Sequence, residues 1–218
     1  MKRKHNWLNH LFNFLAVILG VYLAFLINEK AKNNQDYKES RTLMTSLVND
    51  LSEDIQDYEN FLIPVNIQHQ KNVESLLNSL MTDSLDGIND QMFAILSVEN
   101  FAPTTSTYSS MKASGKLGLI DDLSLQKSLS DYYEGLAVEN IRKGEYQVEY
   151  FTTEVMAWLT NNVDLTNMEF IHTDELTVFL NKLIIYGSLV SQKIESYEMS
   201  VESSRELKLQ IESILEPN

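Results

Sequence analysis

The chain has 218 residues and a formal net charge of −14, and it contains no cysteine. The missing thiols exclude disulfide bonds, thiolate metal sites and thiol catalysis. All 31 acidic residues follow position 28, so the part after this position carries 14 basic and 31 acidic side chains, a net charge of −17. Phosphate backbones repel such a body, which excludes nucleic-acid binding.

The first predicted element is an apolar run at residues 8–27, preceded by Lys2, Arg3 and Lys4. A bilayer core about 30 Å thick is crossed by about 20 mainly apolar helical residues, so the run has the length of a membrane span. A buried helix of a soluble domain and a cleaved signal peptide are the alternatives. No small-x-small cleavage site follows Ala24. We therefore predict an uncleaved signal anchor that lies in the lipid bilayer.

The orientation of this anchor is predicted from its basic flanks. Lys30, Lys32, Lys38 and Arg41 follow the run, and a dense basic cluster with the α-amino group lies in residues 1–7. Charges on a long following domain weigh less in the positive-inside rule. We expect residues 1–7 to form a cytoplasmic tail. This predicts a single-pass protein of the bacterial inner membrane with a periplasmic C-terminal domain.

Small residues recur every four positions inside the predicted anchor, at Ala16, Gly20 and Ala24. This spacing places them on one helical face, where two membrane helices can approach closely. The alternative is that the face contacts only lipid. The pattern therefore marks a possible packing face for a second copy or a partner helix.

The next stretch, residues 28–42, is almost wholly polar and contains neither glycine nor proline. We predict a helical stalk here, about 20 Å long at 1.5 Å per residue. Residues 43–218 then form the predicted helical-bundle domain. Apolar residues return at helical spacing from Leu43 to Leu62, and Pro64 is expected to end this helix.

Shorter elements are predicted in the middle of the chain. A helix covers Val65–Met81 and a turn follows at Asp83–Gly87. A short helix then runs from Ile88 to about Leu96. Residues 99–106 contain Pro103 and several polar residues, so we expect a loop there.

The two longest helices are predicted to come last, from near Asp122 to about Asn161 and from after Thr173 to about Leu215. Their apolar residues alternate at spacings of four and three, which is the seam of helices that pack at a shallow angle. No run alternates long enough to predict a strand. The sequence therefore predicts an all-α protein, in which the membrane helix continues into an elongated antiparallel bundle. The two expected seams are Ala137, Ile141, Gly144, Val148, Phe151, Val155 and Trp158, and Leu176, Leu180, Leu183, Gly187, Val190, Ile194, Tyr197 and Val201.

Each seam contains one glycine near its middle, Gly144 in the first and Gly187 in the second. Glycine costs about 1 kcal/mol in a helix interior relative to alanine unless packing requires it. One interpretation is that the two glycines mark a close crossing of the two helices. The alternative is a local weak point in each helix.

Residues that could carry chemistry are few. Glu169 and His172 form the Glu-x-x-His spacing of a di-iron site, but His69 has Asn66 at the matching position, so the required second copy is missing. No nucleophile elbow or phosphate-binding loop is present. We predict no catalytic residue, cofactor site or metal site, and therefore a protein that is not an enzyme.

The segment Phe101–Tyr108, followed by Met111–Ile120 and Leu125–Tyr133, resembles the central signature of a family of short bacterial membrane proteins of unknown function. Gly20 and Ala24 in the anchor are also similar to that family. The resemblance implies one N-terminal membrane helix ahead of a helical domain. It implies no catalytic residue, because the family has no established activity.

Two roles are open for this signature, which reads as a helix, a glycine stop and a second helix. It can dock the short helix against a long one. Alternatively, Tyr108, Lys112 and Lys116 form a surface for a partner or ligand, with two lysines in an otherwise acidic protein.

The sequence leaves two classes of function. The first is a non-enzymatic interaction or accessory subunit, anchored in the membrane by residues 8–27 and binding a protein partner or a second copy of itself. The second is an extracytoplasmic sensor or binding module that recognises a small ligand and acts through a partner.

Overall fold

The computed structural model describes residues 4–82, 88–167, 169–172 and 175–216. The turn expected at Asp83–Gly87 and the first three residues of the basic tail lie outside this part. Nearly all of it is helical, which confirms the predicted all-α class. The helical elements are α1 (Lys4–Asp57), η1 (Tyr58–Leu62), α2 (Ile63–Met81), α3 (Ile88–Ala94), α4 (Ser106–Ala113), η2 (Lys116–Leu119), α5 (Leu123–Ser130), η3 (Asp131–Leu136), α6 (Ala137–Tyr150), η4 (Phe151–Met156), α7 (Ala157–Asn162) and α8 (Leu176–Leu215).

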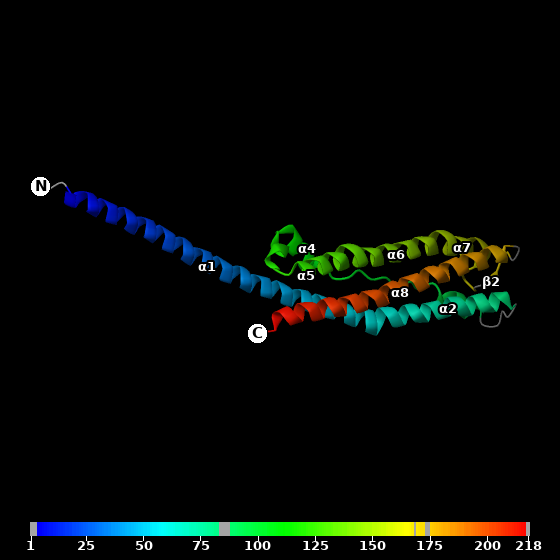
Figure 1. Cartoon of the computed structure of the whole chain (residues 1–218). Helices are drawn as coiled ribbons and strands as arrows, with labels where there is room; N and C mark the ends of the chain where they lie inside the picture. Colours follow the sequence, from blue (N-terminus) through cyan, green and yellow to red (C-terminus); the bar gives the residue numbers. More distant parts are fainter. Residues whose placement is uncertain (1–3, 83–87, 168, 173–174, 217–218) are drawn as a thin grey trace.

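The N-terminal helix is unbroken over the joined elements α1, η1 and α2 (Figure 1). The prediction that Pro64 ends this helix is therefore wrong. Pro64 lies in the first turn of α2, directly after the π-helical turn η1. Inside an α-helix, proline has no N–H to donate, and its ring clashes with the backbone carbonyl four residues earlier. The wider π turn shifts that carbonyl, so the helix passes the proline without a break.

The chain passes along the molecule four times (Figure 1). The helix α1–α2 runs outward from the N-terminus, and α3, an extended segment and α4 lead back. The segment α5–α7 runs outward again, and α8 returns. We call residues 97–105, which have no regular secondary structure, the strap. The strap takes the place that a helix has in a four-helix bundle.

Helix α8 is the centre of the bundle, because it contacts α1, α2 and α6. It runs antiparallel to both outward segments, as Figure 1 shows. The predicted elongated antiparallel arrangement is thus present. The outward segments α1–α2 and α5–α7 are parallel to each other.

A short hairpin joins α7 to α8, where no strand was predicted. Its strands are β1 (Val163–Asp164) and β2 (Glu169–Phe170), paired antiparallel with Val163 opposite Phe170. Two-residue strands are too short to show the alternating pattern on which a strand prediction depends. The backbone N–H of Ile171 donates to the Asn162 carbonyl at 2.8 Å, which ties the hairpin to the end of α7.

The core consists of two large apolar clusters at opposite ends of the bundle, with a smaller one between them. The cluster near the long N-terminal helix joins α1, α4, α5, η3 and the end of α8, and includes Leu47, Leu51, Met111, Leu125, Leu129 and Ile211. The distal cluster joins α2, α3, η4, α7 and the start of α8, and includes Val73, Leu76, Met92, Val155, Trp158 and Phe179. The small central cluster is Tyr58, Leu62, Tyr197 and Val201.

The predicted seam of α6 is only partly correct. Ala137, Gly144 and Phe151 face the core as expected, but Val148 is 37% exposed. The inward positions between them are Asn140 and Gln147. The heptad spacing fits positions 140 and 147 as well as positions 141 and 148. The predicted seam took the apolar residues of these pairs, whereas the structure buries the polar ones. In α8, similarly, Phe179 and Tyr186 are buried while Leu180 is only half-buried.

Candidate functional site

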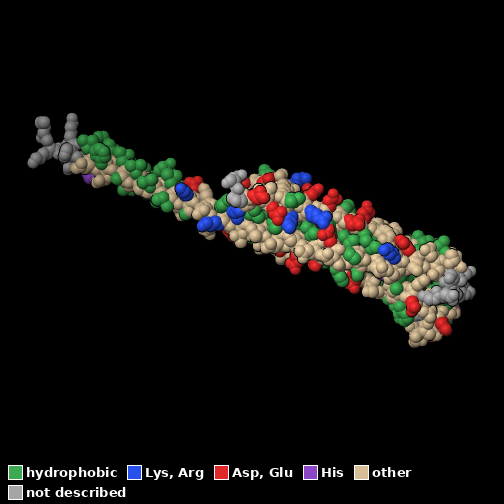
Figure 2. All heavy atoms as spheres, turned by 90° about the horizontal axis from the view of Figure 1, so that it is seen from below, with side chains coloured by type: hydrophobic (Ala, Val, Ile, Leu, Met, Phe, Trp, Pro, Cys, Tyr) green, Lys and Arg blue, Asp and Glu red, His purple; other side chains and the backbone are tan. Residues whose placement is uncertain are grey.

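The first functional feature is the apolar surface of α1. One helix of the described chain is long and apolar enough to cross a membrane, and none of its apolar window is buried in the structure. Phe14, Val21 and Ile27 are exposed by 62–70%. Figure 2 shows hydrophobic side chains along a narrow rod that projects from the bundle, and the surface of the bundle carries acidic side chains. Exposed apolar surface of this extent marks a membrane or protein contact.

The predicted packing face at Ala16, Gly20 and Ala24 points away from the bundle. An alanine methyl group at Gly20 would meet nothing within 4 Å. Gly20 is 27 residues from Leu47, which is fully buried in the bundle on the same unbroken α-helix. This separation is about seven and a half turns at 3.6 residues per turn, so the two residues face opposite sides. The bundle therefore leaves the face accessible to another helix.

Tyr108, Lys112 and Lys116 each contact another element of the bundle. Tyr108 is buried, stacks on Tyr133 with ring centroids 4.6 Å apart, and donates its hydroxyl to Glu134. The ammonium of Lys112 pairs with the same carboxylate at 2.6 Å. Lys116 pairs with Glu39 of α1 at 2.7 Å. These contacts correspond to the docking role, while the side chains of Lys112 and Lys116 remain 56% and 43% exposed, so the partner surface stays a prediction.

Gly144 and Gly187 do not mark a crossing of α6 and α8. A Cβ atom at Gly144 would lie 3.0 Å from Oδ1 of Asn100 in the strap. A Cβ atom at Gly187 would meet only Val73 of α2, at an ordinary 3.5 Å. Gly144 thus makes room for the strap, because a methyl group at that position would press against the Asn100 side chain.

The centre of the bundle contains buried polar groups that the sequence analysis missed. Asn140 donates to the Tyr58 hydroxyl at 3.0 Å and accepts a hydrogen bond from Ser196. Gln147 donates at 3.1 Å to the hydroxyl of Tyr186, which lies 2.7 Å from Nε2 of His69. Mutual hydrogen bonds offset the cost of burying these groups. Polar side chains are expected to be exposed, so the sequence did not predict the burial of these residues. Their hydrogen-bond partners on other elements explain it.

Two ionisable side chains hold the strap to this centre. Lys193 of α8 is fully buried, and its ammonium donates to the Glu99 carbonyl at 2.7 Å and to Oδ1 of Asn100 at 3.1 Å. Burial lowers the pKa of Lys193 to about 7, against a smaller opposite effect of Glu99. Asp54 of α1 accepts the backbone N–H of Thr104 at 3.0 Å. Burial raises the pKa of Asp54.

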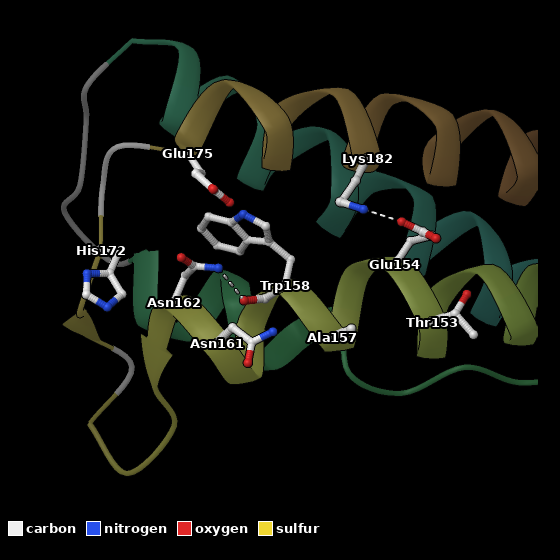
Figure 3. Close-up of a pocket in the computed structure, with 9 residues that line it drawn as sticks. All are labelled: Thr153, Glu154, Ala157, Trp158, Asn161, Asn162, His172, Glu175 and Lys182. Carbon is white, nitrogen blue, oxygen red and sulfur yellow. Dashed lines mark hydrogen bonds and ion pairs between the residues drawn. The ribbon is translucent and has the colours of Figure 1, made fainter.

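The second functional feature is a pocket at the end of the bundle farthest from the apolar helix (Figure 3). It has a volume of about 490 Å³, within the range of small-molecule sites. The end of η4, helix α7, the start of α8 and the residue His172 form its walls. The lining residues are Thr153, Glu154, Ala157, Trp158, Asn161, Asn162, His172, Glu175 and Lys182.

Trp158 forms the aromatic wall of this pocket. Its ring stacks on Phe179 of α8, with centroids 4.1 Å apart and planes at 9°, and Phe170 of β2 meets it at 6.4 Å. The side chain is 5% exposed, and its Nε1 has no hydrogen-bond partner in the part of the chain that the structure describes. A buried indole N–H usually has a partner, and leaving such a group unpaired costs about 1–3 kcal/mol.

Charged side chains surround the indole. Lys182 and Glu154 form an ion pair on one wall. Glu175, the residue before α8, points toward the side of the ring that carries the indole nitrogen (Figure 3). Trp158 and Glu175 both line the pocket.

The Glu-x-x-His residues do not lie on one helical face. Glu169 belongs to β2 and His172 follows it in the chain, next to the distal pocket. Among the residues that the structure describes, no group of three or more His, Cys, Asp or Glu side chains is arranged to hold a metal ion.

Comparison with known proteins gives one match. No curated protein and no solved structure matches the chain. Residues 13–181 match the family of unknown function DUF6090. The matched part covers most of the apolar run, the strap, the buried polar residues up to α6, and every lining residue of the distal pocket except Lys182. Because this is more than half of its length, the chain belongs to the family of unknown function DUF6090.

Proposed function

We propose that this protein is a single-pass membrane protein whose acidic helical bundle acts, without catalysis, as an interaction or accessory subunit of a membrane complex. The observation that carries the proposal is the wholly exposed apolar window of α1. The same unbroken helix continues into the bundle, so the anchor and the domain are rigidly joined. A rigid connection favours a role in holding the bundle at a set distance from the bilayer.

The proposed location is the bacterial inner membrane, with the bundle in the periplasm. The basic residues before the apolar run support this orientation. Protease added to intact spheroplasts is expected to digest the bundle, and the same treatment of lysed cells serves as the control for accessibility. Full protection in spheroplasts with digestion after lysis would contradict the orientation.

The proposed contact within the membrane is the face with Ala16, Gly20 and Ala24. Gly20→Leu is expected to weaken self-association or partner binding without affecting membrane insertion, because a large side chain separates the two helices. Tyr22→Leu is the matched control, since a step of two residues is about 200° around the helix. Equal effects of both variants would assign no special role to this face.

The accessory role itself is tested by purifying the full-length protein from its own host in mild detergent and identifying what comes with it by mass spectrometry. We expect a stoichiometric membrane partner or a homo-oligomer. Recovery of the protein alone as a monomer would contradict the proposal.

A second candidate function is binding of a small ligand, with the signal passed on through a partner. The distal pocket favours it, because its volume of about 490 Å³ lies in the range of small-molecule sites. A ligand-dependent rise in melting temperature would support this function. It is compatible with membrane anchoring, since the pocket lies at the opposite end of the bundle.

A further inference from the structure

A groove with a volume of about 670 Å³ lies between α8 and the helical segment where η1 meets α2. Its floor is apolar. Val201 belongs to the small central cluster, Ile63 packs against that cluster, and Leu209 of α8 lines the groove with 65% of its surface exposed. The described part of the chain therefore leaves part of this apolar floor uncovered.

One side of the groove is acidic. Glu198, Glu202 and Glu206 line it at a spacing of four residues along α8, and we call these three residues the glutamate row. All three are exposed, and none has an ion-pair partner in the described part of the chain. Arg205, the one basic side chain among the described lining residues, is already paired with Glu59. The groove thus combines an apolar floor with three unbalanced carboxylates.

These charges restrict what can occupy the groove. The glutamate row repels anionic surfaces and a second copy of the same face, because either would bring like charges together. The groove begins at Glu59, which is 32 residues beyond Ile27 on the unbroken first helix. This separation is about 48 Å along the helix axis, so the groove lies away from the bilayer predicted at residues 8–27.

The spacing of the carboxylates indicates several separate cations. Residues four apart rise by about 6 Å along a helix, and their side chains lie on one face. The described residues hold no group of three carboxylates arranged around one metal ion. Basic side chains that repeat once per turn on another helix match the glutamate row, and apolar side chains beside them match the floor.

We propose that this groove binds a basic amphipathic helix of a protein partner. Apolar side chains of that helix would cover Leu209 and Ile63, and its Lys or Arg side chains would pair with the glutamate row. This is the helix-in-groove mode of recognition, in which one helical face supplies the anchors. The inference rests on the proposed accessory role and names the chemistry of the partner.

A designed peptide tests the groove. It has about 18 residues, enough to form a helix, with leucines along one face, lysines on the flanks of that face and a fluorescein label. The full-length protein is held in nanodiscs of neutral phosphatidylcholine, and empty nanodiscs give the background. We expect a saturable rise in anisotropy that weakens with added salt. A peptide with glutamine at every lysine position should bind about tenfold more weakly.

Two triple variants compare the glutamate row with exposed carboxylates of α2 and α6 that do not line the groove. The row variant should raise the dissociation constant of the lysine peptide about tenfold, since three ion pairs are lost. The control removes the same net charge and should bind like the parent. The variants are Glu198→Gln/Glu202→Gln/Glu206→Gln for the row and Glu74→Gln/Glu145→Gln/Glu149→Gln for the control.

Three results would overturn the groove as the site. They are no saturable binding of the lysine peptide, equal binding of the two peptides, and equal weakening by the two triple variants, which would reflect net charge alone. Leu209→Ser tests the apolar floor. Because this side chain is exposed, the variant should melt like the parent yet bind the peptide more weakly, and unchanged binding would contradict the assigned floor.

Purification from the host separates this inference from the role on which it rests. A membrane partner that is recovered with the control but lost from the row variant would support the groove. A partner recovered equally with the parent and with the row variant would overturn the groove and leave the accessory role intact.

Discussion

At the scale of single residues, the most unusual group is Lys193. Lysine is seldom fully buried without a carboxylate partner, yet here the ammonium is held by a backbone carbonyl and an amide oxygen. Its Nζ is also 5.9 Å from the Tyr197 ring centroid. Burial disfavours the charged form, so folding and protonation of this side chain are linked.

This linkage predicts a pH dependence of stability. The folded-state pKa of Lys193 is about 7, below its ordinary value of 10.5. Between these values the unfolded chain binds a proton that the folded chain has lost. The free energy of unfolding should therefore rise with pH above 7, by up to about 1.4 kcal/mol per pH unit from this group. Urea unfolding between pH 7 and 9 measures it.

Lys193→Met should remove this slope, and the control Lys71→Met, which changes an exposed lysine of α2, should retain it. The window ends below pH 10, where tyrosines of the unfolded chain begin to ionise. A slope that is the same in both variants would show that Lys193 does not titrate in this range.

At the scale of elements, the strap replaces a helix in one position of the bundle. It is held by Lys193 from α8, by Asp54 from α1 and by the Gly144 carbonyl of α6, which accepts from Nδ2 of Asn100 at 3.2 Å. Phe101 adds an edge contact to Tyr58, with centroids 4.9 Å apart. An extended segment has no internal hydrogen bonds, so these tertiary contacts determine its position.

The two mid-helix glycines give a paired test of this arrangement. Gly187→Ala should stabilise the protein by up to about 1 kcal/mol, because alanine favours the helix and meets Val73 at an ordinary distance. Gly144→Ala should be less stable than Gly187→Ala by about 1–2 kcal/mol, since its methyl group presses on the anchored Asn100 side chain. Chemical unfolding of both variants measures the difference, and equal stabilities would contradict the close packing of the strap.

At the scale of the whole molecule, helix α1 has an exposed part, residues 7–35, which we call the rod. The rod and the bundle are joined by this one helix, but the rod is not buried against the bundle. Every described side chain from Trp7 to Gln35 is exposed, and Ser40 is the first buried residue among those whose side chains the structure describes. Stability of the bundle is therefore expected to be independent of the rod. The described part of the chain does not bury the apolar side chains of the rod, so a bilayer or a partner would have to cover them.

A truncated chain of residues 28–218 tests this separation. It should remain in solution without detergent and melt within about 2 °C of the full-length protein, a smaller shift than 1 kcal/mol would produce in a chain of this size. Circular dichroism on heating provides the measurement. Residues 48–218 serve as the comparison, because losing Met44 and Leu47 removes part of the core near the rod. If residues 28–218 melt much earlier, the rod contributes to folding.

Several features were predictable from sequence because they depend on neighbouring residues. The apolar run, the acidic body, the long helices and their approximate ends follow from local pattern and composition. The sequence alone also predicted the all-α class, because a helix forms its backbone hydrogen bonds within itself.

Other features depend on which distant residues meet, and only the tertiary structure decided them. Asn140 faces the core in place of Ile141 because hydroxyl groups of η1 and α8 satisfy it. Gly144 accommodates the strap and not α8, and the π turn η1 carries the first helix past Pro64. At the distal pocket, a short hairpin brings Phe170 and helix α8 brings Phe179 against Trp158. Periodicity along one helix contains no information about these partners, since each contact joins elements far apart in the chain.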